Sequence, residues 1–89
     1  MQYEYDPNKS AANKEKHGID FEEAQALWGD ERHLEAPTSL TEEPRYYVVG
    51  QIEGIHWTAI ITYRGETTRI ISVRRSRKNE VQHYEKANN

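Results

Sequence analysis

A basic run from Arg69 to Lys78 carries the side chains best suited to chemistry on phosphate groups. Its cations are Arg69, Arg74, Arg75, Arg77 and Lys78. A guanidinium binds two phosphate oxygens at once through its planar fork, and it stays charged at every physiological pH. The run therefore indicates a site where a phosphodiester is bound or cleaved.

Strand alternation singles out Arg74 within this run. Successive side chains of a strand point to opposite faces, so Ile71 and Val73 share one face while Ser72 and Arg74 share the other. Ile71 and Val73 favour the face of the sheet that a helix covers. Arg74 would then lie on the opposite, uncovered face. A bulge or the strand end would let Arg75 join it there. Arg74 is the predicted stabiliser of negative charge on a reacting phosphate. The alternative is a surface arginine paired with a carboxylate.

His17 is the predicted acid or base, because an imidazole titrates near neutral pH. It stands at the end of the first predicted helix, between Lys16 and Gly18. Lys16 is the predicted electrostatic partner. Each of the two residues has a structural alternative, in which it only stabilises the last carbonyls of the helix.

Glu80 is the other candidate for a catalytic base, provided that it faces the arginines from the last helix. A carboxylate in that position more often holds an arginine in place, and we favour this structural role. The remaining histidines, His33, His56 and His83, are widely spaced, and the chain has no cysteine. We therefore expect no metal site and no cofactor.

Four aromatic residues fall on predicted strands: Tyr46, Tyr47, Trp57 and Tyr63. Aromatic rings of this kind stack on the bases of single-stranded nucleic acids. Packing is the commoner role of aromatic side chains at strand positions. Both roles stay open at this stage.

The charges are segregated along the chain, although the formal net charge is only −3. Residues 20–43 hold eight acidic residues and one basic residue, whereas residues 64–78 hold six basic residues and one acidic residue. The second segment adds Arg64 to the predicted nucleic-acid contacts. The plain alternative is two solvated faces of opposite sign.

The 89 residues, 35% of them hydrophobic, suffice for one modest core, so residues 1–89 are expected to form one domain. The lack of cysteine argues against a disulfide scaffold and a thiolate nucleophile. Apolar stretches long enough to span a membrane are missing, and the first residues do not resemble a signal segment. A cytoplasmic location is expected.

Residues that cap helices and residues that form turns indicate where each helix and strand begins and ends. A helix is expected over Pro7–His17, a second helix from Asp20 to Gly29, and a short strand over His33–Ala36, followed by a loop to Pro44. Three strands follow, over Arg45–Ile52, Ile55–Tyr63 and Thr67–Arg74, joined by short glycine-bearing turns, and a last helix covers Ser76 to about Ala87. The predicted fold is α+β, with two N-terminal helices, an antiparallel sheet of three to four strands and a C-terminal helix.

Several segments, in order and spacing, resemble the BrnT family, which belongs to the RelE-like ribonuclease toxins. Departures from the family pattern are Val73 in place of alanine, Arg64 before Gly65, and Arg77 where a capping Thr or Ser is common. The segments that carry the resemblance are Tyr5-Asp6-Pro7, Asn13-Lys14-Glu15-Lys16-His17-Gly18-Ile19, Phe21-Glu22-Glu23-Ala24, Trp28-Gly29-Asp30, Arg45 to Gly50, Arg69 to Arg75, and Glu80 with Tyr84.

This resemblance implies a RelE-like fold and a metal-independent endoribonuclease that cleaves single-stranded RNA and so inhibits translation. It also implies a ribbon-helix-helix antitoxin of the BrnA type, whose complex with the toxin binds operator DNA. In such an enzyme the catalytic set would be Arg74, His17, Lys16 and Glu80. The predicted RNA contacts are Arg64, Arg69, Arg75, Arg77 and Lys78.

The competing hypotheses are a non-catalytic module that binds nucleic acid or protein through the same basic surface, and a degenerate toxin kept for antitoxin binding. Geometry separates catalysis from binding: His17 or Glu80 within reach of Arg74 around one cleft favours catalysis, whereas arginines along an open flat face favour binding.

Overall fold

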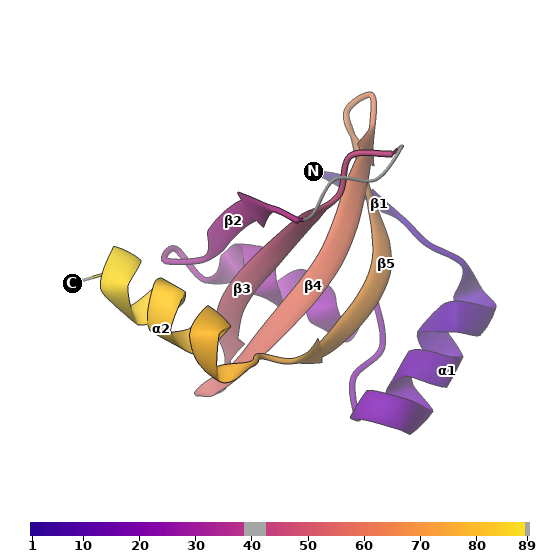
Figure 1. The fold of residues 1–89 in the computed structure, drawn as a ribbon. Helices are drawn as coiled ribbons and strands as arrows, with labels where there is room; N and C mark the ends of the chain where they lie inside the picture. The colour runs from indigo at the N-terminus through magenta and orange to yellow at the C-terminus, as the bar shows by residue number, and fades with distance from the viewer. Residues whose placement is uncertain (39–42, 89) are drawn as a thin grey trace.

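The computed structural model describes residues 1–38 and 43–88 (Figure 1). Residues 39–42, part of the loop expected between Pro37 and Pro44, lie outside the described residues, as does residue 89. The elements in chain order are β1 (Gln2–Glu4), α1 (Pro7–His17), the 3-10 helix η1 (Glu23–Gly29), β2 (Leu34–Pro37), β3 (Tyr46–Ile52), β4 (Ile55–Arg64), β5 (Thr67–Arg75) and α2 (Lys78–Ala87).

Within residues 1–38 and 43–88, the strands form one mixed sheet of five strands in the order β1-β5-β4-β3-β2. β1 runs parallel to β5, with Tyr3 opposite Thr68, and every other pair is antiparallel. The expected antiparallel sheet of three to four strands is therefore wrong. Three residues are too few to show strand alternation, and the partner of β1 stands near the other end of the chain, so no local pattern reveals this strand.

The antiparallel meander of β3, β4 and β5 is confirmed. Its two turns use residues with positive φ, namely Glu53 at 52° and Gly54 at 81° in the first turn, and Gly65 at 60° in the second. Glycine adopts these angles without steric cost, which is why the turns fall where the sequence predicts them.

The helix α1 has the predicted limits. The Asp6 side chain accepts a hydrogen bond of 2.8 Å from the Asn8 backbone N–H, and Pro7 occupies the first turn. At the other end Gly18, with φ of 84°, donates its backbone N–H to the Lys14 carbonyl at 2.9 Å. Capping at both ends therefore explains why this helix could be predicted.

The second expected helix is a 3-10 helix, so the prediction of two N-terminal α-helices is also wrong. Its capping pair does form, since the Glu23 N–H donates to Asp20 at 2.7 Å and the Asp20 N–H donates to Glu23 at 3.0 Å. The buried side chains Phe21, Ala24 and Leu27 are spaced by three residues. That spacing matches the three residues per turn of a 3-10 helix.

The two faces of the sheet are covered differently. The core face carries Ala59, Ile61 and Val73, which pack with Leu27 of η1 and with Phe21 just before it. The opposite face, here called the open face, is covered by α2 over part of its area only. Figure 1 shows α2 at one end of β3 and β4, and α1 beside β5.

Across the described residues no helix combines the length and the apolar character needed to cross a membrane.

Candidate functional site

The strand β5 carries Arg74 to the open face. Arg74 stands opposite Thr58, whereas its neighbour Val73 is buried opposite Ala59 on the core face. A bulge in the β4–β5 pairing skips Ile71, because Ile61 pairs with Ile70 and Ile60 with Ser72. Arg74 therefore lies on the face that alternation predicts.

The same bulge changes the grouping expected for the first half of β5. Ile70 lies on the core face and is 2% exposed, although uninterrupted alternation from Arg74 would place it on the open face. An inserted residue reverses the alternation on one side of it, which strand periodicity cannot foresee. The bulge therefore lets Ile70 and Val73 share the core face.

Glu80 of α2 holds the Arg74 guanidinium in a bidentate fork. Arg74 Nη1 donates to Oε1 of Glu80 at 2.7 Å, and Nη2 donates to Oε2 at 2.8 Å. Glu80 also accepts hydrogen bonds from the Arg77 backbone N–H at 2.7 Å and from Thr58 Oγ1 at 3.0 Å. These four donors satisfy a carboxylate whose side chain is only 6% exposed.

The protonation states of this pair follow from its contacts. Burial opposes ionisation of Glu80, but the donors from Arg74, the Arg77 backbone and Thr58 outweigh it and lower the pKa of Glu80 to about 2. The hydrogen bond to Glu80 in turn raises the pKa of Arg74. Both groups are charged at neutral pH, so the geometry supports the structural role that we favoured for Glu80.

The fork leaves one edge of the Arg74 guanidinium without a protein partner. A guanidinium has five N–H donors. Nη1 uses both of its donors, on Glu80 and on the Arg75 carbonyl at 3.3 Å, and Nη2 uses one on Glu80. Within the described part of the chain, the Nε donor and the second Nη2 donor are unused. These two point along the same edge, which is the pair that binds two oxygens of one phosphate.

Arg74 lines a pocket of about 440 Å³ on the open face. The floor of this pocket is formed by Tyr47 of β3 and Ile60 of β4, and its wall by the start of α2. Arg74, Glu80 and a cleft are thus brought together, as the catalytic hypothesis requires. The lining residues are Pro37, Thr38, Tyr47, Ile60, Arg74, Arg77, Asn79 and Glu80.

The predicted RNA contacts are spread over three places. Arg77 lines the pocket, and Lys78 next to it is the exposed first residue of α2. Arg75 turns to the core face, where its guanidinium carbon lies 5.7 Å from the centre of the Trp57 ring. Its location shows that the strand end does not bring Arg75 into the pocket beside Arg74.

Arg64 and Arg69 lie at the other end of the β4–β5 hairpin. Both pair with Glu4 of β1, Arg64 at 3.8 Å and Arg69 at 3.5 Å. Arg69 is five residues before Arg74, which corresponds to roughly 15 Å along a strand. These two arginines are therefore outside the pocket, on a continuation of the same surface.

His17 and Lys16 lie at the end of α1, on the helix that packs beside β5 and buries its Asn13 against Val73. His17 is half-buried and Lys16 is exposed. Among residues 1–38 and 43–88, neither side chain has a hydrogen bond or ion pair to a group of the pocket. The structure thus brings Arg74 and Glu80 together, whereas His17 and Lys16 are not among the described residues that line the pocket.

Asn13 has a role that the sequence analysis did not identify. Its amide bonds both backbone groups of Val73, donating to the carbonyl at 2.8 Å and accepting from the N–H at 3.2 Å, and it also donates to the Ile19 carbonyl at 2.8 Å. The side chain replaces a neighbouring strand where β1 has ended. The sequence did contain one signal for this role, namely a polar residue on the side of α1 that faces the sheet, because a buried amide requires hydrogen-bond partners.

Two residues of the last helix anchor it to the sheet. Glu80 binds Arg74 as described, and Tyr84, one turn later, donates its hydroxyl to Asp30 at 2.7 Å. Burial and this hydrogen bond raise the pKa of Tyr84 to about 12. Asp30 also accepts from the Gln51 backbone N–H at 2.8 Å. The start of α2, and with it the wall of the pocket, is therefore fixed at two points.

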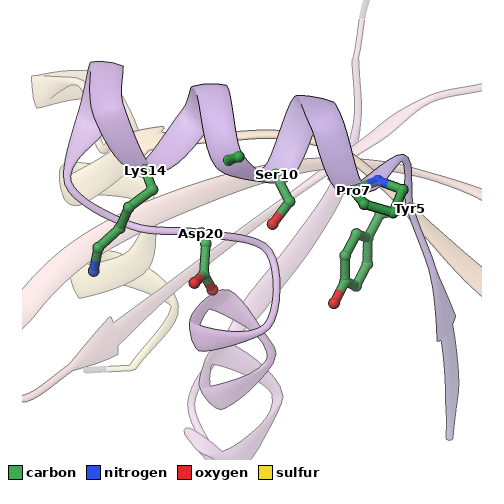
Figure 2. A pocket seen from close by; sticks show the side chains of 6 residues that line it. Tyr5, Pro7, Ser10, Lys14 and Asp20 are labelled. Carbon is green, nitrogen blue, oxygen red and sulfur yellow. The ribbon is translucent and has the colours of Figure 1, made fainter.

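A second hollow lies between α1 and the segment that follows it, and Figure 2 shows Tyr5, Pro7, Ser10, Lys14 and Asp20 around it. Its volume is about 420 Å³. Lys14 is paired with Glu23 at 2.8 Å, and Ser10 accepts from the Phe21 N–H. This hollow contains none of the predicted site residues.

In the parts of the chain that the structure describes, no three His, Asp or Glu side chains gather in a way that could hold a metal ion.

A family model described as the ribonuclease toxin, BrnT, of type II toxin-antitoxin systems matches residues 5–80, which is most of the chain. A search of curated proteins found no match.

Proposed function

Because the chain belongs to the BrnT family of type II toxin-antitoxin ribonuclease toxins, we propose that it cleaves single-stranded RNA without a metal ion, at the pocket around Arg74. The observation that carries the proposal is the fork to Glu80. The fork fixes Arg74 at a pocket and leaves a pair of N–H donors for a phosphate. Cleavage of messenger RNA would inhibit translation.

The proposed reaction is attack of a 2′-hydroxyl oxygen on the adjacent phosphorus. The new bond joins O2′ to phosphorus, and the bond from phosphorus to O5′ breaks. The hydroxyl proton passes to a base, and the leaving O5′ receives a proton, so the products are a 2′,3′-cyclic phosphate and a 5′-hydroxyl. Negative charge grows on the non-bridging oxygens, where the free edge of Arg74 stabilises it.

Glu80 acts in this proposal as the residue that positions Arg74. A carboxylate with a pKa of about 2 is a weak base, and four donors already occupy its oxygens. The acid and base roles of His17 and Lys16 stay predictions.

Arg77 and Lys78 beside the pocket, and Arg69 and Arg64 along the hairpin, are proposed to bind neighbouring phosphates. Their spread over roughly 15 Å of β5 suits a few nucleotides of an extended strand rather than one phosphate. Arg75, over Trp57, would contact RNA only where the strand leaves the open face.

The proposed partner is an antitoxin of the BrnA ribbon-helix-helix type. It would cover the surface from Arg64 to Lys78 and block entry of RNA, and the complex, rather than the toxin alone, would bind operator DNA. Reversing the charge of Arg77 and Lys78 tests this part. An antitoxin complex of unchanged affinity would show that the antitoxin binds elsewhere.

The decisive experiment incubates the purified protein with a defined single-stranded RNA in EDTA and identifies the product ends. We expect cyclic phosphate ends, and we expect Arg74→Lys to cleave about 100-fold more slowly or worse, by analogy with the loss of one oxyanion donor. Lysine keeps a positive charge for Glu80, so the fold is preserved, but it lacks the second edge of donors.

Arg32→Lys serves as the matched control, because it changes an exposed arginine that lies outside both the pocket lining and the proposed RNA contacts. Cleavage that requires added Mg²⁺ would contradict the metal-independent reaction. RNA binding without any product would favour the non-catalytic module. Equal rates for Arg74→Lys and wild type would remove Arg74 from the mechanism.

A further inference from the structure

Tyr47 and Ile60, which form the floor of the pocket, belong to one row of residues across four strands. The register places Ala36 of β2 opposite Tyr47, Tyr47 opposite Ile60, and Ile60 opposite Ser72. The two central residues, Tyr47 and Ile60, are large and aromatic or apolar. The two outer residues, Ala36 and Ser72, are small. Tyr47 and Ile60 therefore form an apolar floor flanked by smaller side chains in the same row.

Tyr47 differs from the neighbouring strand tyrosines. Tyr46 and Tyr63 lie on the core side and contact each other, with ring centres 5.4 Å apart. Tyr47 is half-buried on the open face and lines the pocket. Among the described residues, its ring has no aromatic partner and its hydroxyl has no hydrogen-bond partner. Packing alone therefore does not account for its ring.

The next row toward α2 holds Arg74. The register pairs Thr58 with Arg74, one row beyond Ile60 and Ser72. With strands about 4.8 Å apart and rows about 6.7 Å apart, the backbone positions of Ile60 and Arg74 are about 8 Å apart. An apolar floor and a phosphate-binding edge are thus side by side in one cavity. The volume of about 440 Å³ lies within the usual range for small-molecule sites.

We propose that Tyr47 and Ile60 form a base-binding subsite, in which an unpaired RNA base stacks on the Tyr47 ring while an adjoining phosphate binds the free edge of Arg74. This inference rests on the proposed function and adds to it the residue that positions the nucleotide at the cleaved bond. Stacking suits every base, because each has a π-face. The subsite therefore selects single-stranded over paired RNA, since a paired base cannot enter the pocket.

The charges around the subsite favour RNA over a protein side chain as its occupant. The pocket combines Arg74 and the exposed Arg77 with a carboxylate that is fully committed to Arg74. A nucleotide supplies an anionic phosphate and a flat ring in one unit, matching both features at once. An aromatic side chain of a protein partner would match only the floor.

The experiment measures binding of a single-stranded oligonucleotide whose riboses are all 2′-O-methylated, so that it cannot be cleaved by 2′-hydroxyl attack. Tyr47→Val removes the ring and keeps a residue suited to strands, Tyr47→Phe keeps the ring, and Tyr63→Val is the matched control on the other face. We expect Tyr47→Val to weaken binding about 5-fold to 100-fold, and Tyr47→Phe and Tyr63→Val to bind within about twofold of wild type.

A second series places one abasic nucleotide at each position of the oligonucleotide in turn. For wild type, one position should weaken binding by about the same factor as Tyr47→Val. The same abasic position should have little further effect on Tyr47→Val, because the stacking contact is already absent. Thermal unfolding of each variant shows that its fold is retained.

Three outcomes would overturn the subsite. The first is an RNA affinity of Tyr47→Val equal to that of wild type. The second is a loss of affinity in Tyr47→Phe as large as in Tyr47→Val. The third is an abasic position that weakens RNA binding by Tyr47→Val as much as it weakens binding by wild type. Weakened antitoxin binding with unchanged RNA binding would assign the floor to a protein partner instead. Because the probe is uncleavable, wild type that binds it through Tyr47 but fails to cleave natural RNA overturns the proposed function and leaves the subsite standing.

Discussion

Replacing Glu80 by glutamine perturbs the fork while changing the shape of the side chain very little. At neutral pH the substitution removes the negative charge that faces Arg74, and the amide nitrogen then opposes one of the two Arg74 donors, which lie 2.7 and 2.8 Å from the carboxylate oxygens. The Arg74 side chain is 21% exposed, so it can turn partly toward water and recover some hydration.

The expected cost follows from the pKa of Glu80. That pKa falls from the ordinary value of 4.5 to about 2 on folding. At about 1.4 kcal/mol per pKa unit, the ionised carboxylate contributes roughly 3 kcal/mol to the free energy of unfolding at pH 7. We therefore expect Glu80→Gln to lose about 2–3 kcal/mol, which lowers the melting temperature by roughly 8–24 °C in a domain of this size.

The sign of the pH dependence provides the sharper test. Because the folded-state pKa is lower than the unfolded-state pKa, the contribution is complete above about pH 4.5 and is lost as the pH falls toward 2. Urea unfolding at pH 7 and at steps down to pH 2.5 should show the difference between wild type and Glu80→Gln shrinking over this window. Glu85→Gln, at a 60% exposed position of the same helix, should change stability by less than about 1 kcal/mol.

Two results would refute this reasoning. Equal stability of Glu80→Gln and wild type at pH 7 would mean that the fork does not stabilise the fold. A difference that stays constant from pH 7 to pH 2.5 would mean that Glu80 does not titrate as its contacts require.

Three further predictions concern other parts of the molecule. Asn13→Ala should cost about 2–3 kcal/mol in urea unfolding, because both backbone groups of Val73 lose their partner, and unchanged stability would contradict the edge-capping role. Gly50→Ala should cost about 1–3 kcal/mol, since its Cβ would come within 3.1 Å of a buried side chain, whereas Gly29→Ala, with nothing within 4 Å, should be tolerated. His17→Ala tests the predicted acid or base role: we expect RNA cleavage to slow by about 100-fold or more with little change in thermal stability, and an unchanged rate would remove His17 from the mechanism.

Much of the local structure was determined by the sequence. Asp6, Pro7 and Gly18 delimit α1 through interactions within a few residues, so its limits could be predicted. Gly54 and Gly65 likewise place the turns of the meander. The position of Arg74 on the open face followed from strand alternation, because Val73 next to it must be buried.

Elements that depend on distant partners could not be predicted. β1 is a strand only because β5 offers it an edge, and the bulge that turns Ile70 to the core face depends on the pairing of β4 with β5. η1 packs Leu27 and Ala24 into the core with residues of β3, β4 and β5. In each case contacts between segments far apart in the chain decide the outcome, and local propensity does not.

For the candidate site as well, some features could be predicted from the sequence and others depend on the tertiary structure. Residue types alone indicated phosphate chemistry, because guanidinium groups bind phosphates in any fold. Only the tertiary structure joins Glu80 to one edge of Arg74 and leaves the other edge free, and only the register across the sheet places Tyr47 beside it. His17 is not among the described residues that line the pocket. Side-chain chemistry is a property of each residue, whereas the relative placement of residues depends on the packing of α2 and the strands against one another.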